Sequence, residues 1–236
     1  MKPYRIQRHE ITDSTNDDAK KAAGAGEAEG LVVWALEQKA GRGRHGRSWI
    51  SPQGNLYCSI LLRPSHELQT FGQYSFVAAL ALCDLIDNFL PQSSVTLKWP
   101  NDVLVDGKKI GGILLEAGDG WVVVGIGLNV LHHPDEVLYP STSLYAEAMD
   151  QIELVPVLEM LLDSLWRWYE VIKAEGFTPI RLAWLEHAEK GPLSVRLPQE
   201  TIKGTFKDLG KDGSLILLLA DGSERAIASG DVFTGT

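Results

Sequence analysis

Hydrophobic and polar positions along the chain follow two periods, one typical of helices and one typical of strands. Apolar side chains recur at helical spacing in the long segments 71–90 and 154–175. Continuous apolar or β-branched runs bounded by glycine-containing turns predict strands instead. The expected helices cover residues 14–24, 71–90, 154–175 and 178–188, and the expected strands cover residues 31–37, 56–62, 95–99, 103–105, 110–116 and 121–130.

Turn residues predict how these elements connect. Asp106-Gly107 and Asp119-Gly120 supply tight hairpin turns, and such close spacing favours an antiparallel meander over helical crossovers. After Gly191-Pro192 the pattern changes to short strands separated by glycine turns. We therefore expect an α+β protein, with a mixed, mostly antiparallel sheet and packed helices over residues 1–189 and a small β-barrel over residues 190–236.

Composition and charge narrow the class of protein. The 236 residues are 44% hydrophobic and 22% charged, which is ordinary for a globular chain. A formal net charge of −9 disfavours a general nucleic-acid-coating protein, whose affinity comes from basic surface. Two cysteines make neither a disulfide framework nor a zinc set, so we expect a reduced, cytoplasmic protein. No secretory signal or membrane-spanning stretch is recognisable, so no membrane partner is expected.

A segment rich in glycine and arginine follows the strand that ends near Gln38. Glycines at positions 41, 43 and 46 let the backbone approach a ligand, and Arg42, Arg44 and Arg47 offer charge-assisted donors for phosphate or carboxylate. The segment lacks Gly-Lys-Ser/Thr, so it is not a Walker loop. It is an anion cradle by composition, although a flexible loop or an RNA-binding patch would look similar. Trp49, at its far end, suits a core or a base-stacking platform.

Two further segments present polar groups beside strands. In Lys98-Trp99-Pro100-Asn101-Asp102 a proline interrupts a strand and exposes Lys, Asn and Asp at one break. In the segment 108–116, two glycines within an apolar strand suggest a bulge or a close ligand approach, directly after Lys109. Taken alone, the first segment also fits an ordinary turn, and the second also fits a hairpin with solvated lysines and a packing glycine.

Two weaker signals complete the candidates. Gly125-Ile126-Gly127-Leu128-Asn129 matches only part of a dinucleotide fingerprint, without a third glycine or a following helix, so we reject a Rossmann interpretation. Asp13-Ser14-Thr15-Asn16 reads as a helix start. Its hydroxyl and amide groups also suit an uncharged polar ligand.

Together, in this order and spacing, these segments resemble the biotin protein ligase family (biotin–[acetyl-CoA-carboxylase] ligases) over nearly the whole chain. The motifs that carry the resemblance are the Gly-Arg-Gly-Arg-x-Gly-Arg-x-Trp loop, the Lys-Trp-Pro-Asn-Asp turn and the Lys-Ile-Gly-Gly-Ile-Leu strand. The resemblance implies the class II synthetase-like biotin/lipoate ligase catalytic fold, with an SH3-like C-terminal barrel. It also implies an ATP-dependent enzyme that forms biotinyl-5′-AMP and pyrophosphate, then passes biotin to a lysine of a biotin carboxyl carrier protein.

The resemblance also assigns roles to individual residues. The implied catalytic residues are Arg44, Lys109 and Asp102. The implied biotin-binding residues are Ser14, Thr15, Asn16, Gln38, Arg42, Gly43, Arg44, Lys109, Gly112, Ile113 and Leu114. The implied ATP- or adenylate-binding residues are Arg42, Arg44, Arg47, Trp49, Asn101, Asp102 and Asn129. Mg²⁺ is expected on the phosphates, no metal ligand is assigned, and Asp102 serves either metal binding or the acceptor amine. His45 stands where some relatives have arginine, and a histidine side chain is neutral or only weakly charged near pH 7.

Several expectations and alternatives remain open. The closest alternative is a lipoate or octanoate ligase of the same fold, followed by an Arg/Gly RNA-binding module and a catalytically inactive biotin sensor. Because Ser14 lies close to the first residue, we expect no helix-turn-helix domain and no direct DNA binding. A homodimer is compatible with the resemblance, while the carrier protein is not identified. The glycine-rich loop is predicted to be mobile when empty and to fold over the adenylate.

Overall fold

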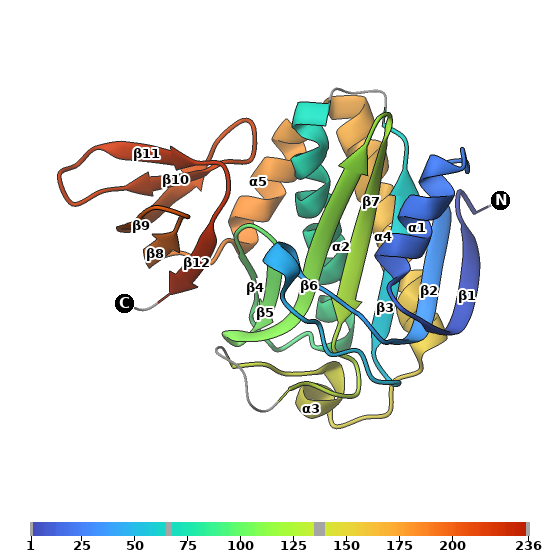
Figure 1. The fold of residues 1–236 in the computed structure, drawn as a ribbon. Helices are drawn as coiled ribbons and strands as arrows, with labels where there is room; N and C mark the ends of the chain where they lie inside the picture. Colours follow the sequence, from blue (N-terminus) through green and yellow to red (C-terminus); the bar gives the residue numbers. More distant parts are fainter. Residues whose placement is uncertain (1, 65–67, 135–139, 235–236) are drawn as a thin grey trace.

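The structure is a computed structural model, and it describes residues 2–64, 68–134 and 140–234. Its larger sheet runs through the first half of the chain (Figure 1). The strands are β1 (Arg5–Thr12), β2 (Leu31–Gln38), β3 (Leu56–Leu62), β4 (Val95–Lys98), β5 (Asp102–Val105), β6 (Lys108–Gly118) and β7 (Trp121–Leu128). Their order is β1-β2-β3-β7-β6-β5-β4, and within it only β1 and β2 pair in parallel. The expected mixed, mostly antiparallel sheet is confirmed, including the meander from β4 to β7.

Helices cover both faces of this sheet. They are α1 (Thr15–Gly24), α2 (Tyr74–Phe89), α3 (Leu144–Ala148), α4 (Leu154–Glu175) and α5 (Phe177–His187), with short 3-10 helices η1 (Arg44–Gly46) and η2 (Leu68–Gln73). Helix α1 connects β1 to β2 and lies on the face opposite α2 and α4 (Figure 1). Among the helices of the described residues, none has both the length and the apolarity needed to cross a membrane.

Alternation of side chains along the strands creates the two faces. In β2, Val32 and Trp34 join the large core beneath α2 and α4, whereas Leu31 and Val33 join a small cluster under α1. The same alternation holds in β7, where Val124 faces the large core. On the α1 face, Gly112 of β6 and Gly125 and Gly127 of β7 take positions that apolar side chains could fill, and the sheet there lies open to a pocket.

A bulge interrupts the pairing of β5 with β6. Val103 pairs with Gly111 but Leu104 pairs with Lys109, so Ile110 is the extra residue on β6. The bulge that the two glycines suggested is therefore present. It matters for the site because a bulge re-aims the side chains beside it, here Lys109.

The C-terminal part forms a second, antiparallel sheet next to α5 (Figure 1). Its strands are β8 (Pro192–Arg196), β9 (Thr201–Leu209), β10 (Leu215–Leu218), β11 (Glu224–Ile227) and β12 (Asp231–Thr234), in the order β11-β10-β9-β8-β12. The first four match, to within one residue at each end, strands that the sequence predicts at residues 193–197, 201–208, 215–219 and 225–228. Closure of this sheet into an SH3-like barrel stays a prediction, as does the domain boundary at residues 189 and 190.

Besides the short 3-10 helices η1 and η2, three elements were not predicted from the sequence. Strand β1 is exposed along most of its length, so it lacks an apolar face that would reveal it. Helix α3 has five residues, and β12 has four. The Trp99–Pro100 peptide bond is cis, which the sequence analysis also did not foresee.

Candidate active site

All sixteen residues assigned to the site from the sequence line one pocket of about 430 Å³, on the α1 side of the sheet. The pocket lies at the adjoining ends of β2, β5, β6 and β7. Further lining comes from Lys98 and Gly125, and from β12 and β8 of the C-terminal sheet through Asp231, Phe233 and Arg196. A hollow of about 570 Å³ beside the end of α2 is larger, but its described lining contains no arginine, lysine or histidine.

The start of α1 forms the hydroxyl-and-amide end of the pocket. Ser14, Thr15 and Asn16 are all buried. The Gln38 side-chain oxygen accepts hydrogen bonds from the Thr15 amide at 2.9 Å and from the Thr15 hydroxyl at 3.1 Å. In the described part of the chain the Ser14 hydroxyl makes no capping bond to α1. Its hydroxyl is therefore available to a polar ligand.

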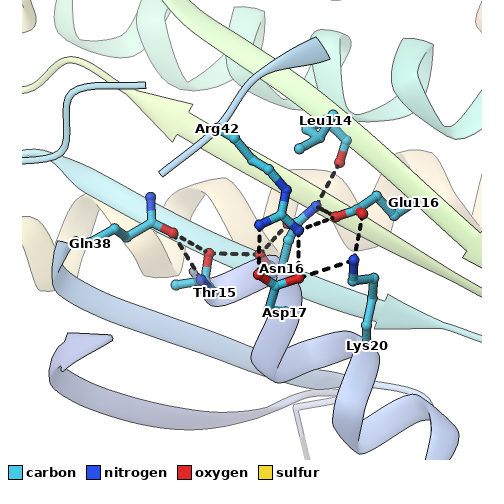
Figure 2. A network of polar contacts seen from close by, with 9 residues as sticks. Thr15, Asn16, Asp17, Lys20, Gln38, Arg42, Leu114 and Glu116 are labelled. Atoms are coloured by element: carbon cyan, nitrogen blue, oxygen red, sulfur yellow. Dashed lines mark hydrogen bonds and ion pairs between the residues drawn. The ribbon is translucent and has the colours of Figure 1, made fainter. Parts of the chain in front are cut away.

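Asn16 is held by groups that fix which way its amide points (Figure 2). Its Nδ2 donates to Oε2 of Glu116 at 2.9 Å, and its Oδ1 accepts from the Ser59 hydroxyl at 2.6 Å. Ser59 is fully buried and also lies 2.8 Å from the Thr15 hydroxyl. Because a carboxylate only accepts hydrogen bonds, Glu116 sets the amide orientation of Asn16. Neither Glu116 nor Ser59 was among the residues predicted from sequence.

Arg42 crosses from the glycine-rich segment to the same network (Figure 2). Its guanidinium donates to both carboxylate oxygens of Asp17, at 2.5 and 2.6 Å, and to Glu116 at 3.2 Å. Hydrogen bonding from Arg42 lowers the pKa of the Asp17 carboxyl to about 2. Burial raises the pKa of the Glu116 carboxyl, but hydrogen bonds from Lys20 and Asn16 outweigh it and the net shift is downward. Arg42 therefore ties the loop to α1 and β6.

The glycines of β7 and β6 make room on the pocket floor. A Cβ atom on Gly125 would lie 2.0 Å from Oδ1 of Asn16, and one on Gly127 would lie 2.6 Å from the Trp49 ring. A Cβ on Gly112 would lie 3.2 Å from the same ring. Side chains at these positions would displace Asn16 or Trp49, so the partial glycine pattern of β7 reflects close approach of side chains rather than dinucleotide binding.

The reactive end of the pocket contains basic groups and Asp102. Lys109 donates a 2.6 Å hydrogen bond to Oδ1 of Asp102. Asn101 donates to the Ile113 carbonyl and Asn129 donates to the Thr142 carbonyl, both at 2.9 Å. Lys98, which belongs to the same motif but was not assigned to the site, is buried here, and its burial lowers the pKa of its ammonium. Basic groups in a partly buried pocket of an acidic chain provide an anion site.

The loop tip carries Arg44 and Arg47, which both contact the C-terminal sheet. Arg44 donates to the Gly230 carbonyl at 3.2 Å, and Arg47 forms an ion pair with Asp231. Burial lowers the pKa of the Arg44 guanidinium, while the charges of Asp231 and Asp102 oppose that shift. The C-terminal sheet therefore contributes to the pocket, and neither Gly230 nor Asp231 was among the residues predicted for it.

The side chains of the pocket limit how a metal ion could bind there. Among the described residues, no three or more His, Cys, Asp or Glu side chains lie together as a metal site. Magnesium in nucleotide sites is usually held by one or two carboxylates together with phosphate oxygens. Asp102 and Asp231 line the pocket. Because Arg47 already pairs with Asp231, Asp102 is the carboxylate that fits a magnesium ion brought by a nucleotide, and the two do not form an all-protein cage.

The geometry defines a class of site. One end of the pocket suits a neutral polar group of a ligand, and the other end suits an anionic, nucleotide-like group. A profile of the Biotin/lipoate A/B protein ligase family matches residues 9–126, and one of the Biotin protein ligase C terminal domain matches residues 194–235. The chain is 38% identical to the biotin–[acetyl-CoA-carboxylase] ligase of Paracoccus denitrificans, over 95% of this chain and 98% of that protein. This chain therefore belongs to the biotin protein ligase family.

Other relatives agree with this assignment. The bifunctional ligase/repressor BirA of Bacillus subtilis is 36% identical, over 89% of this chain and 68% of that protein. The solved structure of the biotin protein ligase from Aquifex aeolicus in complex with biotin and ATP superposes with a TM-score of 0.85 at 27% identity, covering 97% of each chain. The expected catalytic fold is thereby confirmed.

Proposed function

We propose that this chain is an ATP-dependent biotin–protein ligase that activates biotin as biotinyl-5′-AMP and transfers it to a lysine of a biotin carboxyl carrier protein. The observation that carries the proposal is the single pocket in which the Thr15–Asn16–Gln38 network adjoins Arg44 and Lys109. Family membership supports it, and so does the similarity to a ligase solved with biotin and ATP.

We propose that the hydroxyl-and-amide end binds the ureido ring of biotin. That ring offers one carbonyl acceptor and two N–H donors, which need partners of both kinds. Ser14 can supply either, and the Asn16 amide is held in one orientation by Glu116 and Ser59. Gly112, Ile113 and Leu114 line the path from this end towards Lys109.

In the first step a biotin carboxylate oxygen bonds to the α-phosphorus of ATP, and the bond to the β-phosphate oxygen breaks. Pyrophosphate leaves with the bonding electron pair. Negative charge grows on the phosphate oxygens, and we propose that Arg44 and Lys109 stabilise it. Trp49, Asn101 and Asn129 would border the nucleotide. If Asp102 serves metal binding instead of the acceptor amine, it would help to hold a Mg²⁺ ion, which would supply further positive charge near the phosphates.

In the second step the carrier lysine nitrogen bonds to the acyl carbon, and the bond from that carbon to the phosphate oxygen breaks. AMP leaves with the bonding electrons, and the nitrogen loses a proton. We propose that Asp102 orients this amine and accepts its proton. Its hydrogen bond to Lys109, the lysine proposed to lie beside the activated carboxyl, supports this role.

We further propose that residues 1–189 form the catalytic domain and residues 190–236 the C-terminal domain. The two family matches, to residues 9–126 and 194–235, support a boundary between them. Both cysteines are free and buried, which suits a reducing cytoplasm. A homodimer remains a prediction.

The decisive experiment is transfer of biotin to an unmodified carrier domain of acetyl-CoA carboxylase, followed by intact-mass measurement. The expected result is a mass increase that requires both biotin and ATP and is lost in Lys109→Ala. Calorimetry with biotin and with lipoate distinguishes the alternative ligase of the same fold. Binding of lipoate alone, or the absence of any modified carrier, would overturn the proposal.

A further inference from the structure

The tip of the glycine-rich loop is anchored to the C-terminal sheet at one place. Arg47 forms its ion pair with Asp231, the first residue of β12, and Nε2 of His45 lies 3.8 Å from Oδ1 of the same carboxylate. Next to it, the Gly230 carbonyl accepts a hydrogen bond from Arg44 at 3.2 Å. The side chains of Arg44, His45 and Arg47 thus meet two neighbouring residues, one directly before β12 and the other at its start.

Within the loop, local bonds close the tip but do not fix where it lies. The Gly43 amide donates to the Arg47 carbonyl at 2.7 Å, and the Arg47 amide donates to the Arg44 carbonyl at 3.2 Å. His45 and Gly46 both have positive φ, at 55° and 72°. These bonds shape a compact turn, and contacts from outside the loop are needed to hold that turn over the pocket.

The two arginines at the tip meet acceptors of different charge. Arg47 faces a carboxylate, so its charge is already compensated by a side chain of the protein. Arg44 faces a backbone carbonyl, which carries no net charge, and it lies deeper in the protein than Arg47. An anion arriving in the pocket therefore gains more from Arg44 than from Arg47.

From this difference we infer that Asp231 is a positioning residue for the ligase reaction. It acts through Arg47 to hold the loop over the pocket, while Arg44 contacts the adenylate phosphate. The inference rests on the proposed function for its effect on the reaction. Its structural part, the anchoring of the loop by Asp231, does not depend on which substrates the protein uses.

Hydrogen exchange of the ligand-free protein tests the structural part. Asp231→Asn keeps the size of the side chain and removes its charge. We expect amides of residues 42–48 to exchange at least about fivefold faster, because local opening of a loop follows the loss of its anchoring contacts. The matched control is Asp208→Asn, which removes the Arg181–Asp208 ion pair of 2.6 Å between α5 and β9. It should leave the loop unchanged. Unchanged loop exchange in Asp231→Asn, or an equal increase in Asp208→Asn, would overturn the inference.

A charge swap tests how Arg47 acts. We expect Arg47→Asp and Asp231→Arg, singly, to raise the KM for ATP about tenfold with kcat changed little, because a displaced loop weakens positioning. The double variant restores an ion pair of opposite polarity and should bring both loop exchange and KM back to within about threefold of the parent. A double variant with a protected loop but an unrescued KM would show that Arg47 itself binds phosphate, against the inference. If the parent forms no adenylate, the proposed function fails while the exchange result still stands.

Discussion

The Lys109 ammonium donates a 2.6 Å hydrogen bond to Asp102 and lies 5.4 Å from the centroid of the Trp49 ring. Three motifs that are separate in the sequence meet at this one nitrogen. The bulge at Ile110 re-aims Lys109, and the backbone of Lys109 is fixed by a 2.8 Å bond from its amide to the Pro140 carbonyl. A cation held this firmly is suited to charge that develops during a reaction, because little reorganisation is then needed.

The first prediction concerns this ammonium. Lys109→Gln should lower the rate of biotin-dependent pyrophosphate exchange by about 100-fold or more, since one preorganised electrostatic donor contributes about 3 kcal/mol. The neighbouring Lys108 is half-exposed and pairs with Glu147 at 2.9 Å, outside the pocket. Lys108→Gln should therefore exchange pyrophosphate at nearly the parental rate. Parental activity in Lys109→Gln would remove this residue from the mechanism.

The second prediction concerns the buried Ser59 hydroxyl. Ser59→Ala leaves the Asn16 side-chain oxygen without this donor, so we expect the Kd for biotin, measured by calorimetry, to rise about tenfold, or about 1.4 kcal/mol. Ser164→Ala is the matched control, because Ser164 is also buried and donates to Asp84 at 2.5 Å, between α4 and α2. Ser164→Ala should lower the melting temperature without weakening the binding of biotin. Similar biotin affinities in both variants would refute the positioning role of Ser59.

The third prediction concerns the floor beneath Trp49. Gly127→Ala introduces a Cβ 2.6 Å from the Trp49 ring, which must shift, and we expect the KM for ATP to rise about tenfold or more. Gly118→Ala serves as the control at the other end of the β6–β7 hairpin, where the new Cβ would lie 2.4 Å from the Trp121 ring. Both variants should lose stability, but only Gly127→Ala should affect nucleotide use. An equal rise in KM in the two variants would show that hairpin distortion, rather than Trp49, is responsible.

The fourth prediction concerns pH. Within the described residues, Oε2 of Glu189 is buried without a hydrogen bond, and burial raises the pKa of this carboxyl while the charge of Lys98 opposes the shift. The raised pKa belongs to the folded state. The favourable contribution of Glu189 to the free energy of unfolding is therefore present at acid pH and is lost as pH rises through that pKa.

Glu189→Gln keeps this side chain neutral at every pH. The melting temperature of the variant minus that of the parent should therefore become more positive as pH rises from about 4.5 to about 8. Glu186→Gln removes the same charge from an exposed position three residues earlier and controls for net charge. Thermal unfolding across this pH range provides the measurement. A difference that stays flat for Glu189→Gln, or that is matched by Glu186→Gln, would contradict the burial argument.

The sequence predicts an element well where local pattern and tertiary packing agree. Strand β3 and helix α4 begin and end at the predicted residues, because β3 is buried along its whole length and α4 has a continuous apolar stripe. Strand β1 has the opposite character, since it is mostly exposed and is defined by parallel pairing with β2. Pairing of this kind depends on distant residues and leaves no periodic signal in the strand itself.

The same distinction applies to the candidate site. The motif residues line one pocket, because hairpins bring β5, β6 and β7 side by side, and the role of each residue stays a prediction. Ser59 and Asp231 were missed for physical reasons. A serine within an apolar strand and an aspartate after a glycine are common in any fold, and their importance here comes from contacts with residues 43 and 184 positions away.

The separation of 184 positions between Arg47 and Asp231 also sets a delay between the synthesis of the two residues. At about 5–20 residues per second, a ribosome takes roughly 10–40 s to proceed from one residue to the other. During that interval the sheet, α1 and the Arg42 contacts can already form, but Asp231 is not yet present to hold Arg47. In a newly made chain the hydroxyl-and-amide end of the pocket would therefore form first. The glycine-rich loop would reach its final position only after β12 has been synthesised.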